Sequence, residues 1–154
     1  MKILIIHHLD PHWEVGYNRA GTSFDDLQVK FLKHLNRVKY DKVILTRFDD
    51  YRLTEEYFPE FAQKVDKVEN YSYGWEKDQV EAEIEECSEK PENWAEGGNH
   101  SDMVWLAPFI RKLKDEDVTI SGAFDGECLE DLEIALKACG VKYKRNEKLI
   151  IKSC

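Results

Sequence analysis

The sequence predicts a single α/β domain over residues 1–154, folded as a three-layer α/β/α sandwich around a mostly parallel sheet of about five strands. Short runs of consecutive apolar residues indicate strands that are buried on both faces. Segments with apolar residues at helical spacing alternate with these runs, as expected for helices that cover a sheet. The 154 residues, 42% of them apolar, are enough to bury one hydrophobic core.

Five segments of the chain are expected to form strands. They are residues 3–6, 43–45, 65–70 and 118–120, and a closing strand that includes 141–143 and 149–151. Because helices separate them, right-handed crossovers should produce a mostly parallel, Rossmann-like sheet. Such a sheet binds ligands at the carboxyl ends of its strands. The segments that follow the strands, at residues 7–12, 47–50 and 122–128, are therefore the places to look for a site.

Helices are expected between these strands. Ser23 should cap the first one, whose apolar stripe consists of Phe24, Leu27, Phe31, Leu35 and Val38. Others are expected at residues 54–64, where Pro59 favours a late start, at 78–89, and from 101 to 113. The last helix carries Leu129, Leu132, Leu136 and Cys139, and Gly140 should end it in the left-handed conformation.

Charge and cysteine spacing narrow the class of protein. The formal net charge of −9 repels phosphate backbones and anionic lipids, so neither nucleic acid nor a membrane is an expected partner. The apolar run at residues 3–6 is too short for a signal peptide or a membrane span. The widely spaced Cys87, Cys128, Cys139 and Cys154 lack a metal-binding cadence. We therefore expect a cytoplasmic protein with free thiols and no cofactor.

A histidine-rich segment, residues 7–12, follows the first strand. His8, Asp10 and His12 could serve as acid and base, or could bind a metal together with the distant His100. The alternative is that these polar residues only end the strand and turn the chain, with Pro11 setting the turn. Because the cysteines lack a metal-binding spacing and no histidine lies between His34 and His100, we expect no tightly held metal.

The segment from Gly122 to Cys128 runs from a buried strand into a helix. A cysteine in the first helical turn is favoured as a thiolate by the helix dipole, and the free N–H groups there could hold an oxyanion. The acidic residues Asp125, Glu127 and Glu130 oppose this by raising the pKa of the thiol, so a nearby cation would be required. The alternative for Cys128 is a small buried core thiol.

The spacing of Gly122, Cys128 and Gly140 resembles the closing motif of the isochorismatase-like cysteine hydrolases. In that family a strand ends in glycine, a turn with a cis peptide bond follows, and the nucleophile opens a long helix. Residues 41–47 (DKVILTR) are also similar to the family's second strand. The family's Asp-x-His metal motif after that strand is lacking here, so the nicotinamidases within the family are not the expected match.

This resemblance implies a catalytic set and a mechanism. Asp10 would take the thiol proton, Lys90 (or, as second choice, Lys77) would stabilise the thiolate and the oxyanion, and Cys128 would form a thioester that water hydrolyses. Four further residues are expected to line the substrate site: His8, Trp13, Phe124 and Asp125. The substrate would be a small amide, ureide or related molecule, and a homo-oligomer is left open.

Two other interpretations of the sequence remain. The first is a non-catalytic binding or interaction protein on the same fold, which would use its acidic face and Trp75, Trp94 and Trp105. The second is a metal-dependent hydrolase built on the histidine-rich segment. The motif at residues 97–102 (GGNHSD) is similar to one of the arginase-like ureohydrolases, but a glycine-rich loop with a helix cap is the better explanation.

Overall fold

The fold was obtained as a computed structural model, which describes residues 1–48, 57–71 and 107–152. Its strands are β1 (Lys2–His7), β2 (Lys42–Phe48), β3 (Lys67–Tyr71), β4 (Asp117–Asp125) and β5 (Tyr143–Lys152). They form one sheet in the order β3-β2-β1-β4-β5, and every neighbouring pair is parallel. The predicted α/β class with a parallel sheet of about five strands is confirmed.

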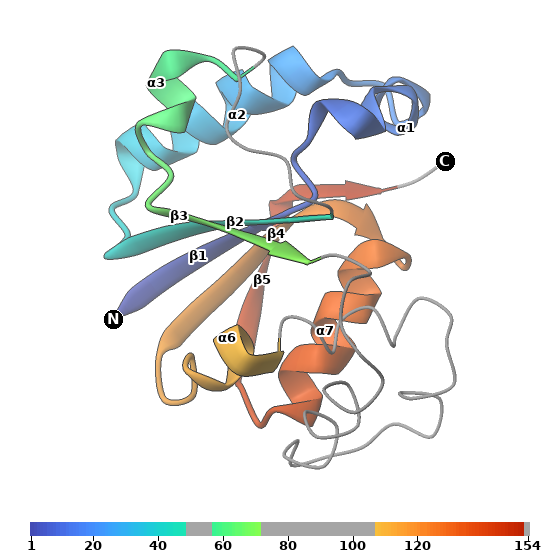
Figure 1. The fold of residues 1–154 in the computed structure, drawn as a ribbon. Coiled ribbons are helices and arrows are strands. Elements are labelled where there is room, and N and C mark those ends of the chain that lie inside the picture. The colour runs from blue at the N-terminus through green and yellow to red at the C-terminus, as the bar shows by residue number, and fades with distance from the viewer. Residues whose placement is uncertain (49–56, 72–106, 153–154) are drawn as a thin grey trace.

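Helices lie on both faces of this sheet (Figure 1). One face carries α1 (Glu14–Arg19), α2 (Phe24–Arg37) and α3 (Pro59–Ala62), and the other carries α6 (Ala107–Arg111) and α7 (Cys128–Ala138). A short 3-10 helix, η1 (Pro11–Trp13), leads from β1 into α1. None of the described helices is long and apolar enough to cross a membrane.

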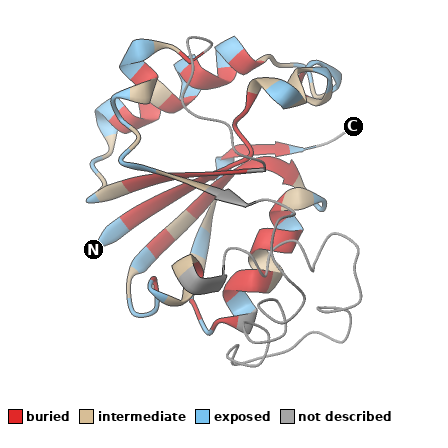
Figure 2. Cartoon of the chain, viewed as in Figure 1, coloured by how far each residue is buried: buried red, intermediate tan, exposed pale blue. Residues whose placement is uncertain are grey.

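β1 lies at the centre of the sheet and serves two hydrophobic cores. Ile3 and Ile5 pack with α6 and α7, whereas Leu4 and Ile6 pack with α1, α2 and α3. This division follows from the alternation of side chains along a strand. Buried residues accordingly run along the central strands and along the helix faces turned towards them (Figure 2). A strand covered on both faces must be continuously apolar, which is the pattern of residues 3–6.

The strand register places three candidate segments side by side. His7, at the carboxyl end of β1, pairs with Thr46 of β2 and with Gly122 of β4. The approach to Gly122 is so close that a Cβ atom there would lie 2.0 Å from the His7 carbonyl oxygen. Glycine is therefore required at position 122, where φ is also +105°. The loop after β1 and the start of α7 thus lie at one edge of the sheet.

Most of the predicted elements within the described ranges are present, with four differences. β4 continues to Asp125 rather than ending at Ile120, and β5 is one strand instead of two short pieces. Residues 14–19 form α1, which was not predicted. The helix predicted at 54–64 is only four residues long where described, and begins at Pro59. The helix predicted at 78–89 and the start of the one predicted from 101 lie outside the described residues.

Candidate active site

The predicted nucleophile, Cys128, is the first residue of the 11-residue helix α7. Gly126, with φ +76°, turns the chain out of β4, and the Glu127 N–H donates to the Phe124 carbonyl oxygen at 3.0 Å. The Ala123–Phe124 peptide bond is cis, in the segment where the family resemblance implies such a bond. Cys128 is half-buried. The prediction that it lies in the first turn of a helix is confirmed.

Cys128 lines a cavity of about 390 Å³ between the β4–α7 junction and α1. The cavity brings together three of the predicted site residues, Trp13, Phe124 and Cys128, and its remaining lining residues are His12, Val15, Gly16, Arg19 and Glu127. The size is within the range of small-molecule sites, about 300–1,000 Å³. Aromatic rings, an arginine and a thiol therefore face one space at the carboxyl ends of the strands.

The aromatic wall of this cavity is fixed by ring contacts. The Trp13 ring stacks on the His8 ring, with the centroids 5.5 Å apart, and meets the edge of Phe124 at 6.5 Å. Gly16 of α1 leaves room for Phe124, because a Cβ atom there would lie 2.6 Å from the Phe124 Cζ atom. The predicted residue His8 thus supports Trp13 from behind, and it does not line the cavity itself.

The two histidines that follow one another at the end of β1 are both buried. Their rings stack at 4.0 Å, and His7 Nδ1 lies 2.7 Å from the Thr46 hydroxyl. Burial lowers the pKa of His8 to about 3. Burial, with His8 beside it, lowers the pKa of His7 well below the usual value, against a smaller raising effect of the Cys128 backbone. Both rings are therefore neutral at physiological pH.

Asp10, the predicted general base, is buried, and both its carboxylate and its backbone form polar contacts. Its carboxylate accepts from the His12 N–H at 2.8 Å and lies 3.7 Å from Nε of Arg47, and its own N–H donates to the Tyr17 hydroxyl at 3.0 Å. Arg47, which is fully buried, also donates to the Tyr57 hydroxyl at 2.9 Å. Asp10 is not among the residues lining the Cys128 cavity.

Of the remaining predicted site residues, Asp125 is described and does not line this cavity. Asp125 pairs with Arg145 of β5 at 2.8 Å, and Arg145 also binds Glu133 and Glu147, so the Asp125 carboxylate belongs to an ion-pair network beside β5. Lys90, Lys77 and His100 lie outside the described residues, as does the glycine-rich segment 97–102.

The histidine-rich segment does not form a metal site within the described part of the chain. No group of three or more His, Cys, Asp or Glu side chains there is arranged to hold a metal ion. The reason is local, because the His7 and His8 rings stack on one another and Asp10 faces His12 N–H and Arg47. The one candidate ligand from another segment, His100, is not described.

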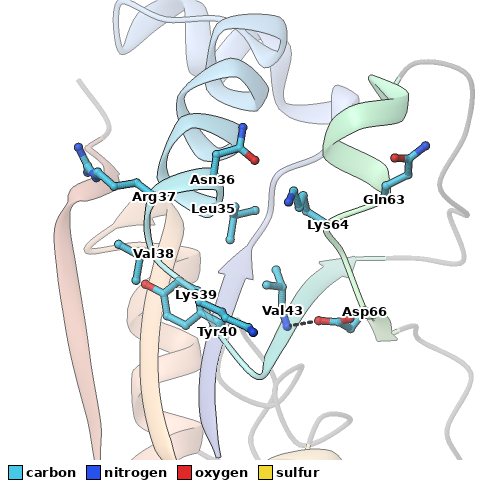
Figure 3. A pocket seen from close by; sticks show the side chains of 10 residues that line it. All are labelled: Leu35, Asn36, Arg37, Val38, Lys39, Tyr40, Val43, Gln63, Lys64 and Asp66. Carbon is cyan, nitrogen blue, oxygen red and sulfur yellow. Dashed lines mark hydrogen bonds between the residues drawn. The ribbon is translucent and has the colours of Figure 1, made fainter.

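A larger cavity, of about 450 Å³, lies at the amino end of β2 (Figure 3). Its lining includes Tyr40, Val43, Lys64 and Asp66, and the Asp66 carboxylate accepts from the Val43 N–H at 2.7 Å. Parallel sheets bind ligands at the opposite, carboxyl edge. Position therefore favours the smaller Cys128 cavity as the candidate active site.

Comparison with known proteins adds no relative to this picture. No protein-family model, no curated protein and no solved structure matches the chain. The geometry itself adds Arg19 and Gly16, which sequence reasoning missed. Both belong to the unpredicted helix α1, so the signal that could have found them was the acidic Glu14 after η1 together with the buried Tyr17.

Proposed function

We propose that this protein is a small cysteine hydrolase that acts on an amide, ureide or related small molecule through Cys128. The observation that carries the proposal is the position of Cys128, at the first residue of α7 and in the wall of a cavity with Trp13 and Phe124. Thiols at helix N-termini are more readily ionised, and the adjacent backbone N–H groups can stabilise an oxyanion. The aromatic wall suits a flat substrate such as an amide or ureide.

In the proposed reaction the Cys128 thiolate attacks the substrate carbonyl carbon, and the oxyanion formed collapses with cleavage of the C–N bond. The leaving nitrogen takes the proton that the base removed from the thiol. Water then attacks the thioester, which releases the acid and restores the thiol. As the family resemblance implies, we assign the base to Asp10 and the stabilising cation to Lys90. Among the described residues, Arg19 is a cation that lines this cavity.

A non-catalytic binding protein that uses the same cavity is the second candidate. The observation that favours it is the contact of the buried Asp10 carboxylate with Arg47 and with the His12 N–H, because these groups compete for the oxygens that a base would use. The acidic Glu127 beside Cys128 also opposes a thiolate. The two candidates share the ligand cavity and differ only in turnover.

One set of measurements separates these candidates. Iodoacetamide labelling from pH 6 to 9, with mass spectrometry to locate the modified thiol, should find Cys128 the most reactive cysteine. Ammonia release from a panel of planar amides and ureides should then be lost in Cys128→Ser, by orders of magnitude. Cys139→Ala is the matched control, because Cys139 is buried in the core at the far end of α7 and should leave turnover intact.

Each outcome favours one candidate. A reactive Cys128 with ligand binding and no turnover would establish the binding protein. If Cys128 resists labelling while Cys139 reacts, both the nucleophile and the hydrolase are wrong. Within the hydrolase, Asp10→Asn should abolish turnover, and Lys90→Ala should raise the pKa of the thiol in the labelling profile. An unchanged thiol pKa in Lys90→Ala would remove Lys90 from the site.

A further inference from the structure

A second pocket, of about 260 Å³, lies between α2 and β5, away from the cysteine cavity. Its lining contains no carboxylate among the described residues, although the chain has 31 acidic and 22 basic residues. The lining residues are Lys30, Lys33, His34, Arg37, Asn146, Lys148 and Leu149. Three lysines and one arginine thus line one small pocket of a protein whose net charge is −9, where acidic residues would be expected to predominate.

Two elements far apart in the sequence build this pocket. On α2, Lys30, Lys33 and Arg37 are spaced so that they share one face of the helix. The helix dipole accounts for basic residues in the last turn, such as Arg37, but not for Lys30 two turns earlier. Figure 3 shows the Arg37 side chain extending away from Lys64 and Asp66, and Arg37 lines both pockets. It therefore faces the β5 side of α2.

On β5, an irregularity in the strand register supplies the rest of the pocket. Ile120 pairs with Arg145 and Gly122 pairs with Ile150, so four residues of β5 stand opposite the single residue Ser121. Such bulges change the direction in which side chains point. Here the bulge contributes Asn146 and Lys148 to the pocket. The carboxylate in the bulge, Glu147, is paired with Arg145 at 2.7 Å instead.

We propose that this pocket binds the phosphate group of a small phosphorylated molecule. Lysine ammonium and arginine guanidinium groups are the usual protein partners of phosphate oxygens, and the Asn146 amide adds a neutral donor. The volume of about 260 Å³ is below that of sites for drug-sized ligands, so it suits a head group rather than a whole large ligand. A long polyanion is disfavoured, because beyond the pocket it would meet a protein of net charge −9.

His34 provides a built-in reporter of this occupancy. Its Nε2 lies 2.7 Å from the Tyr40 hydroxyl, and its pKa is lowered by burial first and then by the positive charges of Arg37 and Lys2. A phosphate dianion in the pocket would oppose these two charges. The His34 pKa should therefore rise on binding, which is visible in the NMR titration of its ring protons.

The test uses inorganic pyrophosphate and phosphate as probes, with the intact chain, at constant ionic strength set by sodium chloride. We expect saturable one-to-one binding of pyrophosphate by calorimetry, with a Kd below about 1 mM, together with a raised His34 pKa. Lys33→Ala and Lys148→Ala should each weaken binding by about tenfold. Lys137→Ala, an exposed lysine on α7, is the control of equal charge change and should bind like the wild type.

Three results would overturn the proposal. They are no saturable binding, equal weakening by Lys137→Ala and Lys148→Ala, and tighter binding of a single-stranded oligonucleotide than of pyrophosphate. The second would indicate diffuse electrostatic attraction, and the third a surface for nucleic acid. All the pocket variants are exposed lysines, so loss of folding does not obscure the outcome. The inference does not depend on the cysteine site, and none of these binding results tests the role of Cys128.

Discussion

A buried arginine connects the end of β2 with the loop after β1 and with Tyr57. Arg47 at the end of β2 lies 3.7 Å from the Asp10 carboxylate and donates to the Tyr57 hydroxyl, which donates in turn to the Leu9 carbonyl oxygen at 2.6 Å. Its guanidinium also lies over the Tyr57 ring, 5.5 Å from the centroid. A charge is costly to bury unless it is paired, so the buried Arg47 and Asp10 side chains each require the other. The role of Arg47 was not evident from the sequence, because the partners are 10 and 37 residues away.

Replacing Arg47 by methionine should lower the free energy of unfolding by about 3–5 kcal/mol, because it leaves the Asp10 carboxylate buried without its counter-charge. Urea denaturation measures this loss. Lys144→Gln is the control, since Lys144 is 71% exposed and pairs with Asp117 at the surface. The control should cost about 0–1 kcal/mol. Equal losses in the two variants would show that the buried pair contributes no more than a surface one.

A second prediction at the residue scale concerns acid stability. The pKa of His8 is about 3 in the folded protein, against an ordinary value of 6.5 in the unfolded chain. The unfolded state therefore binds more protons between these values, so stability is fully present above pH 6.5 and is lost as the pH falls. Between pH 7 and pH 5, His8 alone should remove about 2 kcal/mol.

His8→Asn tests this directly. Asparagine tolerates the positive φ of 55° at this position, and it does not titrate. Urea unfolding at pH 7, 6 and 5 should show a weaker pH dependence in the variant than in the wild type, with His7 still contributing in both. Parallel curves for the two proteins would mean that His8 has nearly the same pKa in the folded protein as in the unfolded chain.

At the scale of elements, apolar periodicity correctly predicted the helices and strands that bury one or both faces. The stripe from Phe24 to Leu35 and the Ser23 cap were correctly placed, and the Ser23 hydroxyl accepts from the Asp26 N–H at 3.0 Å. Val38, the last predicted member of the stripe, lies outside the helix as its extended C-cap residue. Helix α1 was missed because six residues with a central Gly16 are too short to show periodicity. The extension of β4 to Asp125 was missed because Gly122 looks like a strand end.

In the candidate site, too, local sequence patterns predicted some positions and missed contacts between distant segments. The position of Cys128 at the start of α7 could be predicted from a buried strand followed by a glycine-rich turn and an amphipathic stripe. Trp13 and Phe124 line the same cavity. Asp125 does not join them, because its partner Arg145 lies on β5 and no local pattern reveals that pairing. Long-range ion pairs leave no periodic signal in a sequence.

The junction of β1 and β4 supplies the prediction at this scale. Gly122→Ala would place a Cβ atom 2.0 Å from the His7 carbonyl oxygen at a φ of +105°, so the two central strands must separate. We expect a loss well above the about 1–3 kcal/mol of an unfavourable φ alone. Gly126→Ala is the matched control, with φ +76° and no atom within 4 Å of the new Cβ.

Thermal unfolding followed by circular dichroism compares the two glycine variants. Gly126→Ala should cost only about 1–2 kcal/mol, the usual penalty of a left-handed residue. Gly126 lies two residues before the cysteine helix, so this variant also tests whether a side chain in the turn lowers the stability of the protein. Similar losses at the two positions would show that backbone conformation, rather than the close approach to His7, makes Gly122 necessary.

At the scale of the whole molecule, the sheet divides the interior into two cores that share their strands. β1 contributes Ile3 and Ile5 to one core and Leu4 and Ile6 to the other, so neither core can be lost while β1 remains buried. Both candidate sites include residues from the face that carries α1 and α2. The cysteine cavity lies where β4 leads into α7, and the basic pocket lies between α2 and β5.

This arrangement predicts additive core energetics with a single unfolding transition. Ile6 and Ile120 are both fully buried, but Ile6 belongs to the core under α2 and Ile120 to the core under α7. Each Ile→Val substitution should cost about 0.5–1.5 kcal/mol. Because the side chains lie on opposite faces of the sheet and share no packing partner, the loss in the double variant should equal the sum of the two single losses within about 0.5 kcal/mol.

Urea unfolding followed by both tryptophan fluorescence and circular dichroism measures these losses, and the two curves should coincide. Separate transitions for the two probes would show that the cores unfold independently, and a large coupling energy would show that the sheet transmits strain between them.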